Sequence, residues 1–419
     1  MDARPARAAP GLWRLTLLLA GLSMFGPFAI DSIFPAFPAL SADFGAPHAA
    51  VQQTISVYLA AYALMSVLHG PVSDAVGRRP VILIGVAVFV LACIGAALSQ
   101  SLFWLLVFRA LQGMSAGAGL IVARAVIRDC LDGDAAQKLM AQATMIFSVA
   151  PALAPIVGGW ILGWSQWHAI FWAMALFAFL VLLACLIWMP ESHPPQARTP
   201  LRVRPLVRRS WAILKNPRFL QLSLAACFNF GAMFLYISSA PVVVLEHLRL
   251  SEQQFGWMFV PIVAGLMVGS FLSSRMAGRA SQSTTARLGF GLSLLAALGN
   301  LGYNLAVDHI SLPWAVLPLG FAAAGIGLAF PLLTILMLDM YPRHRGSAAS
   351  IQAFTSLSIN AIIAGALAPL LAPYRTGLAL AAVGMCVAAI ALWWRYRRGV
   401  RRDPVLPRPR PMIEEAEQL

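Results

Sequence analysis

The sequence GPVSDAVGRRP, residues 70–80, decides the fold of this chain of 419 residues. It separates two long apolar stretches. Its two glycines permit a sharp turn and a close approach of the backbone. Its aspartate can face arginines or a helix N-terminus across an interface between bundles of helices. The stretch therefore predicts a tight, charged turn between two helices, built on Gly70, Asp74, Gly77, Arg78 and Arg79.

The composition excludes most classes of soluble protein. Hydrophobic residues make up 60 % of the chain and charged residues only 11 %, whereas average soluble proteins are about 45–50 % apolar and about 25 % charged. A soluble fold could not hide so much apolar surface, which excludes an ordinary cytosolic enzyme, a disordered chain and a secreted disulfide scaffold. Because a helix needs about 20 apolar residues to cross a bilayer, the length leaves room for about twelve crossings. The sequence predicts an all-α integral membrane protein.

Apolar stretches recur along the whole chain and predict twelve transmembrane helices. The predicted spans are 12–38, 50–70, 80–99, 103–125, 138–160, 168–189, 218–240, 254–275, 286–306, 313–337, 346–371 and 376–394. The longest polar segment, the linker 190–217, divides them into two halves of six helices, 12–189 and 218–394. A short N-terminus, 1–11, and a basic, Pro-rich tail, 395–419, complete the organisation. Two equal bundles joined by a linker are the architecture of a transporter that moves one bundle against the other.

The net charge of +14 is distributed unevenly over the predicted loops. If the N-terminus is cytoplasmic, 27 of the 30 Lys and Arg residues lie on the cytoplasmic side, and only Arg249 and Arg375 lie outside. Because basic residues favour cytoplasmic loops, both termini are predicted to be cytoplasmic. The charges flank the membrane instead of covering one soluble face, so no nucleic acid is expected as a partner. Membrane lipid is expected, with the start of the tail resting on anionic lipid.

Cysteine and histidine give no sign of metal or redox chemistry. The five cysteines and seven histidines are scattered singly, without a CxxC or HExxH pattern, and the chain has no P-loop. The cysteines are interpreted as small buried hydrophobic residues. We therefore expect neither an enzyme nor an ATP-driven pump, and neither a metal nor another cofactor.

The stretch 70–80 resembles the GxxxDxxGRR/K signature of the major facilitator superfamily. The predicted span 103–125 carries Arg109, Gln112 and Gly113, which are similar to the RxxQG motif of the same superfamily. The resemblance covers essentially the whole chain. It implies the major facilitator fold, with two pseudo-symmetric six-helix bundles that work by alternating access.

A further stretch, APALAPIVGG at 150–159, looks like the APxxxPxxGG motif of proton-coupled drug exporters. Prolines there loosen the helix, and small residues allow helices to pack closely. The positions that match are Pro151, Pro155, Gly158 and Gly159. A merely kinked helix is the alternative interpretation.

The stretch DSIFPAFP, residues 31–38, resembles the D-x-Y-L-P-A-x-P stretch of the Bcr/CflA branch, the bicyclomycin and chloramphenicol resistance transporters. Ile33 and Phe34 replace the usual Tyr and Leu. The stretches 234–241 and 250–256 also look like that branch. The resemblance implies a drug:proton antiporter, a multi-pass and monomeric protein of the bacterial inner membrane.

Asp31 is the only acidic residue clearly inside a predicted span. A carboxylate inside the membrane costs about 2.5–3.5 kcal/mol on insertion scales and is a functional hypothesis by default. Our hypothesis is that Asp31 alternately binds a proton and holds the drug-bound state. The alternative is a helix-end aspartate wetted by the outer headgroups. Some exporters of this type carry a second carboxylate two turns earlier, where this chain has Ser23. This departure argues against more than one proton per cycle and against dicationic drugs.

Arg109 is the cation that we expect to act with Asp31 in proton coupling. Both residues belong to the N-terminal half, where they could face the cavity at similar depth. Arg109 can also hold Gln112 or backbone groups in place. The alternative is a structural arginine that snorkels outwards or caps carbonyl groups.

The drug pocket is predicted near the bilayer midplane between the two halves, mostly apolar and aromatic with a few polar groups. Met24 and Phe28 share one helical face with Asp31, although packing or lipid contact is the alternative role for any single Phe or Met. Polar side chains inside a span usually face the bundle interior. The predicted substrate-binding residues are Met24, Phe28, Tyr58, Tyr62, Met114, Asn229, Tyr236 and Asn360.

These features together predict proton-coupled efflux of small hydrophobic antibiotics such as chloramphenicol or bicyclomycin. The alternative is export of an endogenous small metabolite, an amino acid or a sugar, with incidental drug transport.

Overall fold

The structure is a computed structural model that describes residues 12–130 and 133–402. These residues form helices joined by short connections, and none of them forms a strand. The first half contains α1 (Leu12–Asp31), η1 (Phe34–Ala36), α2 (Phe37–Phe44), α3 (His48–Val76), α4 (Arg78–Ala97), α5 (Leu102–Gly117), η2 (Ala118–Val122), α6 (Ala123–Cys130), α7 (Gly133–Trp164) and α8 (His168–Trp188).

The linker and the second half are also helical. The linker contains η3 (Pro195–Ala197) and α9 (Val203–Leu214). The second half contains α10 (Pro217–Ser238), η4 (Val242–His247), η5 (Glu252–Gln254), α11 (Gly256–Met276), α12 (Gln282–Ala306), α13 (Leu317–Asp339), η6 (Pro342–His344), α14 (Arg345–Ile362), η7 (Ile363–Leu367), α15 (Ala368–Leu371) and α16 (Arg375–Arg402).

Among the described residues, ten helical stretches are long and apolar enough to cross a membrane. Two further apolar helices, Leu102–Gly117 and Val149–Trp164, are shorter. Large apolar side chains such as Leu64, Trp160 and Leu176 remain exposed on the outside of the bundle. Helices that are apolar on every side and display such residues are typical of a membrane protein, because lipid covers them. The prediction of an all-α membrane fold is confirmed.

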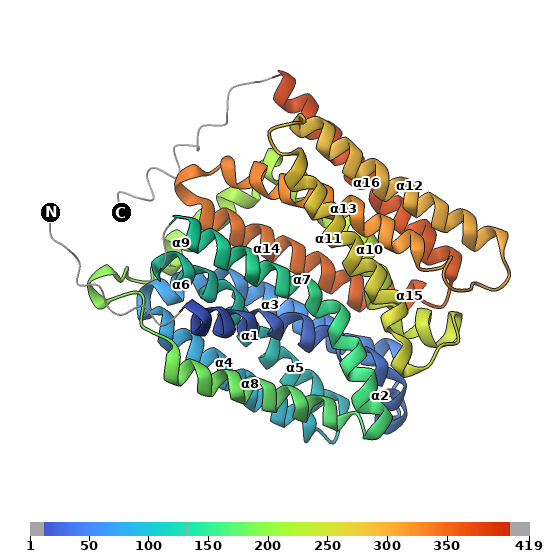
Figure 1. Ribbon diagram of the computed structural model, residues 1–419, viewed down its shortest axis with the longest axis horizontal. Helices are drawn as coiled ribbons and strands as arrows, with labels where there is room; N and C mark the ends of the chain where they lie inside the picture. Colours follow the sequence, from blue (N-terminus) through green and yellow to red (C-terminus); the bar gives the residue numbers. More distant parts are fainter. Residues whose placement is uncertain (1–11, 131–132, 403–419) are drawn as a thin grey trace.

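The two halves repeat the same packing pattern. In the first half α1 packs on α7, α3 on α5 and α4 on α8. In the second half the corresponding pairs are α10 on α14, α11 on α13 and α12 on α16. Figure 1 shows the first half in the lower part of the view and the second half in the upper part. Across the boundary, α3 packs on α14 and α7 on α11.

The predicted turn at 70–80 is shorter than expected. Helix α3 continues to Val76 and α4 begins at Arg78, so Gly77 alone joins them, with a φ of 114°. A side chain is strained at this φ, which explains the glycine. The expectation for Gly70 is wrong, because Gly70 lies inside α3 and no atom lies within 4 Å of the place where its Cβ would be.

Two predicted boundaries also shift. The polar linker contains the amphipathic helix α9, and α16 runs to Arg402, beyond the predicted end of the last span at 394. The chain enters and leaves the linker at one end of the bundle, here called the linker end, and the opposite end is called the far end. The predicted N-terminus, 1–11, and residues 403–419 of the predicted tail lie outside the described residues.

Candidate transport site

Asp31 is the last residue of α1, and its position follows from the prolines after it. An α-helix would need the N–H of residue 35 to bond the carbonyl of Asp31, and Pro35 has no N–H. The chain therefore changes to the short helix η1 and then to α2, which ends at Phe44. Asp31 is 5 % exposed and lies inside the apolar stretch Trp13–Phe44. At about 1.5 Å per residue, it lies about 27 Å from Trp13 and about 20 Å from Phe44 along the chain.

This place bears on the two interpretations of Asp31. The residue does end an α-helix, as the headgroup alternative requires, but residues 33–40 beyond it are all apolar and mostly buried. The C-terminal end of a helix also carries partial negative charge, which opposes a carboxylate there. A charged Asp31 is therefore costly unless a cation or a hydrogen-bond donor approaches it.

Arg109 is completely buried and held from three sides. Its Nε donates to the Thr54 carbonyl at 3.0 Å, and its Nη1 donates to Gln112 Oε1 at 2.7 Å. Its guanidinium lies over the Tyr58 ring, 4.6 Å from the ring centroid. Since Thr54 and Tyr58 are on α3 and Arg109 is on α5, the side chain ties these two helices together.

The network of Arg109 extends to a third helix. Gln112 Nε2 donates to Cys93 Sγ on α4 at 3.1 Å. Sequence reasoning treated Cys93 only as a small buried hydrophobic residue and missed this contact. The expectation that Arg109 holds Gln112 is confirmed, because the spacing of three residues puts both side chains on one face of α5. Gly113 completes the site, because a Cβ there would collide with the Tyr58 carbonyl group.

Asp31 and Arg109 do not form a salt bridge in the described part of the chain. The Tyr58 hydroxyl and Arg109 Nη2 are buried without a hydrogen-bond partner. A bound water, or a polar group of a ligand, could supply the missing hydrogen bonds of the hydroxyl and of Nη2. The first half therefore offers a fixed cation beside a free hydroxyl, and a buried carboxyl group at the end of α1.

The small residues of α7 allow close packing, as their motif predicts. A Cβ on Gly158 would collide with the Ser32 carbonyl, directly after Asp31, and a Cβ on Gly159 would collide with the Glu252 carbonyl in the second half. Pro151 and Pro155 lie inside α7 and remove two of its hydrogen bonds. Helix α7 thus contacts both the Asp31 region and the other half of the molecule.

Arg78, in the 70–80 stretch, has partners that the sequence only partly predicted. Arg78 Nη1 donates to Asp74 Oδ1 at 2.5 Å and to Ser73 Oγ at 2.6 Å, and its Nε donates to Asp129 Oδ2 at 3.0 Å. Asp74 therefore pairs within its own half, and the expectation that it faces the other bundle is wrong. Asp129, at the end of α6, was missed as a partner, although it is a carboxylate at the same end of the bundle.

The linker binds to the same place. Glu191 Oε1 accepts hydrogen bonds from the backbone N–H groups of Arg78, at 3.0 Å, and His193, at 2.9 Å. Ser192 Oγ donates to Asp129 Oδ2 at 3.0 Å. A Cβ on Gly77 would collide with the Glu191 carboxylate, so the glycine is needed for contact as well as for its φ. Arg79 Nη2 donates to the Leu186 carbonyl at 2.9 Å, which ties α4 to α8.

The predicted pocket residues do not gather in one place. Phe28, half-buried on α1, stacks on Phe177 of α8 with centroids 6.1 Å apart, so its ring faces the inside of the first half. Met24 is half-buried on the same helix. Tyr58 and Tyr62 meet edge to face at 6.2 Å. Met114 is 41 % exposed.

The polar candidates of the second half are buried. Asn229 and Asn360 each have an amide oxygen without a hydrogen-bond partner. Asn229 and Tyr236 line a small cavity between α10, α12, α13 and α16, within the second half. The prediction that they face a bundle interior is confirmed, but this cavity is not the expected space between the halves.

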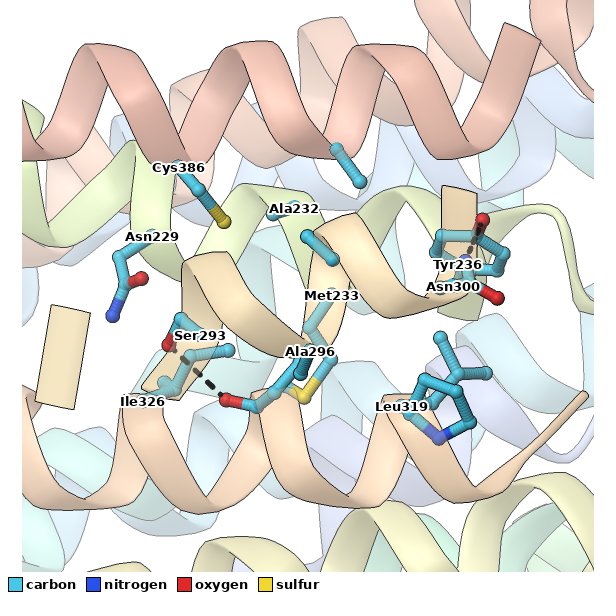
Figure 2. A pocket seen from close by; sticks show the side chains of 14 residues that line it. Asn229, Ala232, Met233, Tyr236, Ser293, Ala296, Asn300, Leu319, Ile326 and Cys386 are labelled. Atoms are coloured by element: carbon cyan, nitrogen blue, oxygen red, sulfur yellow. Dashed lines mark hydrogen bonds between the residues drawn. The ribbon is translucent and has the colours of Figure 1, made fainter. Parts of the chain in front are cut away.

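Figure 2 shows this cavity from close by. Asn300 Nδ2 donates to the Tyr236 hydroxyl at 2.5 Å on one side, and Asn229 lies near Cys386 on the other. Ser293 Oγ donates to the Ala322 carbonyl at 3.3 Å. About 20 Å³ is open to the centre of a water molecule, which is room for about one water. Sequence reasoning missed Asn300, although it is polar inside a span like Asn229.

The two halves are joined by hydrogen bonds towards the far end. Gln52 Nε2 donates to the Ser238 carbonyl at 2.6 Å, and Gln53 Nε2 donates to the Gly365 carbonyl at 2.8 Å. Ser56 Oγ donates to the Ala361 carbonyl at 2.8 Å. All three donors lie in the first three turns of α3, so that helix closes this part of the boundary.

Two repeated helix bundles, a buried carboxyl group and a buried arginine in apolar helices define a membrane transporter rather than an enzyme. The chain belongs to the Major Facilitator Superfamily, whose family model matches residues 16–359. It is accordingly a multi-pass protein of the inner membrane.

Relatives agree with the resemblance drawn from residues 31–38. The bicyclomycin resistance protein homolog of Haemophilus influenzae is 28 % identical over 91 % of this chain and 95 % of that protein. The multidrug resistance protein MdtM of Escherichia coli is 27 % identical over 85 % of this chain and 84 % of that protein. These similarities support drug efflux at a general level.

Solved structures share the fold. A bacterial homolog to the human lysosomal transporter Spinster, in an inward-facing and occupied conformation, superposes with a TM-score of 0.70 at 18 % identity, over 95 % of this chain and 98 % of that chain. The human organic anion transporter MFSD10 gives a TM-score of 0.66 at 19 % identity, over 92 % of this chain and 100 % of that chain. At these identities the likeness concerns the fold alone.

Proposed function

We propose that this protein exports small hydrophobic antibiotics, such as chloramphenicol or bicyclomycin, in exchange for protons. The observation that carries the proposal is Asp31, a buried carboxyl group inside an apolar helical stretch of the half that also holds the fixed Arg109 guanidinium and the Tyr58 hydroxyl. The names of the relatives, which concern bicyclomycin and multidrug resistance, support the class of substrate.

In the proposed cycle Asp31 exchanges a proton for the drug-bound state. A charge at Asp31 is costly inside the membrane, so the residue gains from binding a proton or a ligand that supplies a donor. Arg109 keeps its place through Thr54 and Gln112 and supplies a constant positive charge. Tyr58 has a free hydroxyl that can carry a hydrogen bond between the carboxyl group and a bound water or drug.

One proton per cycle fits the residues of α1. Ser23 stands where a second carboxylate would be, and its hydroxyl donates a hydrogen bond to the Leu19 carbonyl at 2.6 Å. One proton that moves through 100 mV supplies about 2.3 kcal/mol, or roughly a fiftyfold drug gradient. A pH difference across the membrane would add to this. No cofactor other than the proton is part of the proposal.

The proposed transport is by alternating access between two six-helix bundles. Twelve crossings, cytoplasmic termini and a monomer are part of this proposal, and the distribution of basic residues supports the orientation. In that orientation the far end, where Gln52, Gln53 and Ser56 join the halves, faces outwards. Release of the drug would require these three hydrogen bonds to break.

The experiment compares drug accumulation in a bacterial strain that lacks its own exporters. The wild type, Asp31→Asn and the control Asp43→Asn are expressed at matched levels, with and without a protonophore. Asp43 is a matched but exposed aspartate near the end of α2, where its Oδ2 accepts from Trp167 Nε1 at 3.0 Å. We expect lower accumulation with the wild type and Asp43→Asn only, abolished by the protonophore.

Other outcomes would change the proposal. Protonophore-sensitive export that survives Asp31→Asn would keep the antiporter and remove Asp31 from proton coupling. No change in accumulation for any drug would favour the second candidate, an exporter of an endogenous amino acid or sugar. That candidate predicts protonophore-sensitive export of the metabolite from preloaded cells.

A further inference from the structure

The linker helix α9 has three different faces. Ser210 and Ile213 are buried against the linker ends of α10 and α14. Val203, Val207 and Trp211 form an apolar stripe at intervals of four residues, and each is more than half exposed. At about 100° per residue, this stripe lies about 90° round the helix from the buried face.

The third face of α9 is basic. Arg204, Arg208 and Lys215 are exposed and lie about 80° beyond the apolar stripe, on the side away from the protein. A helix that lies flat on a membrane beside a protein needs this order of faces. The protein covers one flank, the apolar stripe enters the bilayer, and the basic flank meets the headgroups.

The place of α9 in the fold agrees with this arrangement. The helix lies at the linker end of the bundle, next to α14 (Figure 1). It follows α8, which ends at Trp188, and precedes α10, which begins at Pro217, so it stays near the level at which membrane helices end.

Pairs of tryptophan and a basic residue mark that level. The Arg14 guanidinium lies 5.4 Å from the ring of Trp13, and the Arg398 guanidinium lies 3.4 Å from the ring of Trp394. Both pairs lie at the linker ends of membrane helices. Tryptophan is enriched where a membrane meets water, and basic residues there attract anionic lipid. At the end of α9 the ammonium of the capping residue Lys215 lies 5.1 Å from the Trp211 ring, which is the same kind of pair.

We propose that α9 is a binding surface for anionic phospholipid. Val203, Val207 and Trp211 enter the boundary between headgroups and acyl chains, and Arg204, Arg208 and Lys215 bind the headgroup phosphates. Charge complementarity favours lipid over a second copy of this chain, because two copies of this face would bring like charges together. The proposal depends on the membrane location alone and is independent of what the protein transports.

The first test measures the depth of α9 in the membrane. A nitroxide label is attached to Val207→Cys on the stripe, or to Arg204→Cys on the basic flank, in the full-length protein in nanodiscs that contain phosphatidylglycerol. The background variant carries Cys130→Ser, because the other four cysteines are buried. We expect oxygen, which concentrates in the bilayer, to collide with the label at 207 more often than a water-soluble nickel chelate does. We expect the reverse for the label at 204. Equal access of the chelate to both labels would overturn the proposal, and so would a label at 207 shielded from both reagents, which a protein partner would cause.

The second test measures the preference for anionic lipid. Phosphatidylglycerol is titrated onto the purified full-length protein, and bound lipid is counted by native mass spectrometry. Arg204→Gln with Lys215→Gln is compared with Arg249→Gln with Arg375→Gln, which removes two charges at the far end. We expect the first pair to weaken binding by about fivefold for each charge removed and the second pair to have no such effect. Equal loss in the two double variants would refute a lipid site on α9.

Discussion

Replacement of Gln112 by Leu tests whether Arg109 is held as the structure shows. Gln112 is completely buried, and its Oε1 accepts from the Arg109 guanidinium at 2.7 Å. Arg109 Nη2 already has no hydrogen-bond partner, so the variant would leave the buried cation with one hydrogen bond, from Nε to Thr54, and the Tyr58 ring. A hydrogen bond to a charged group contributes about 1.5–3 kcal/mol, and we expect a loss of about 2–3 kcal/mol in the free energy of unfolding.

Gln352→Leu is the matched control. Gln352 is also a buried glutamine, but its Nε2 donates to a neutral partner, Thr334 Oγ1, at 2.8 Å. Loss of a neutral hydrogen bond costs about 0.5–1.5 kcal/mol. The entropy of unfolding of a chain of this length converts each loss in free energy into a lower midpoint of thermal unfolding. We expect a midpoint lower by about 2–3 °C for Gln112→Leu and by about 1 °C for Gln352→Leu.

The assay follows thermal unfolding with a dye that becomes fluorescent on reaction with a thiol. It suits this protein, because four of its five cysteines are buried and react only when the helices separate. Cys93, which accepts from Gln112, is one of the four. A midpoint for Gln112→Leu that equals or exceeds that of Gln352→Leu would refute the view that Gln112 supports a buried charge.

Two further predictions concern close contacts between segments. Gly158→Ala would press a methyl group on the Ser32 carbonyl, and we expect a loss of about 1–3 kcal/mol, measured by the same thermal assay. Gly384→Ala is its control, since no atom lies within 4 Å there, and a similar loss in both would contradict the packing argument. Glu191→Ala removes the acceptor of the Arg78 N–H, and we expect trypsin to cleave the linker about ten times faster in the folded protein. An unchanged cleavage rate would show that Glu191 does not hold the linker.

Features that depend on near neighbours in the chain could be predicted from the sequence. The apolar stretches predicted where helices lie, because each stretch must be covered by lipid or by another helix. The spacing of Arg109 and Gln112 predicted their contact, because residues three apart share a face of a helix. The site residue Asp31 could be found because a carboxylate inside an apolar stretch is rare and costly.

Features that depend on the packing of distant segments could not be predicted. Asp74 was expected to face the other bundle, but the end of α6 and the linker close around Arg78 in the first half. Asn229 and Tyr236 were expected between the halves, but the rotation of α10 turns them towards a cavity inside the second half. Periodicity gives the relative positions of side chains on one helix, but not the neighbour that the face meets.

The sequence by itself determined that this is a helical membrane protein of two repeated halves, with an aspartate, Asp31, and an arginine, Arg109, inside apolar spans of its first half. Hydropathy and spacing act along the chain, so the order of residues contains them. Only the tertiary structure decided that the Arg109 guanidinium lies over the Tyr58 ring, and that Gly158 brings α7 against the chain next to Asp31. These contacts join segments far apart in the sequence, and they depend on the angle and the distance at which whole helices pack.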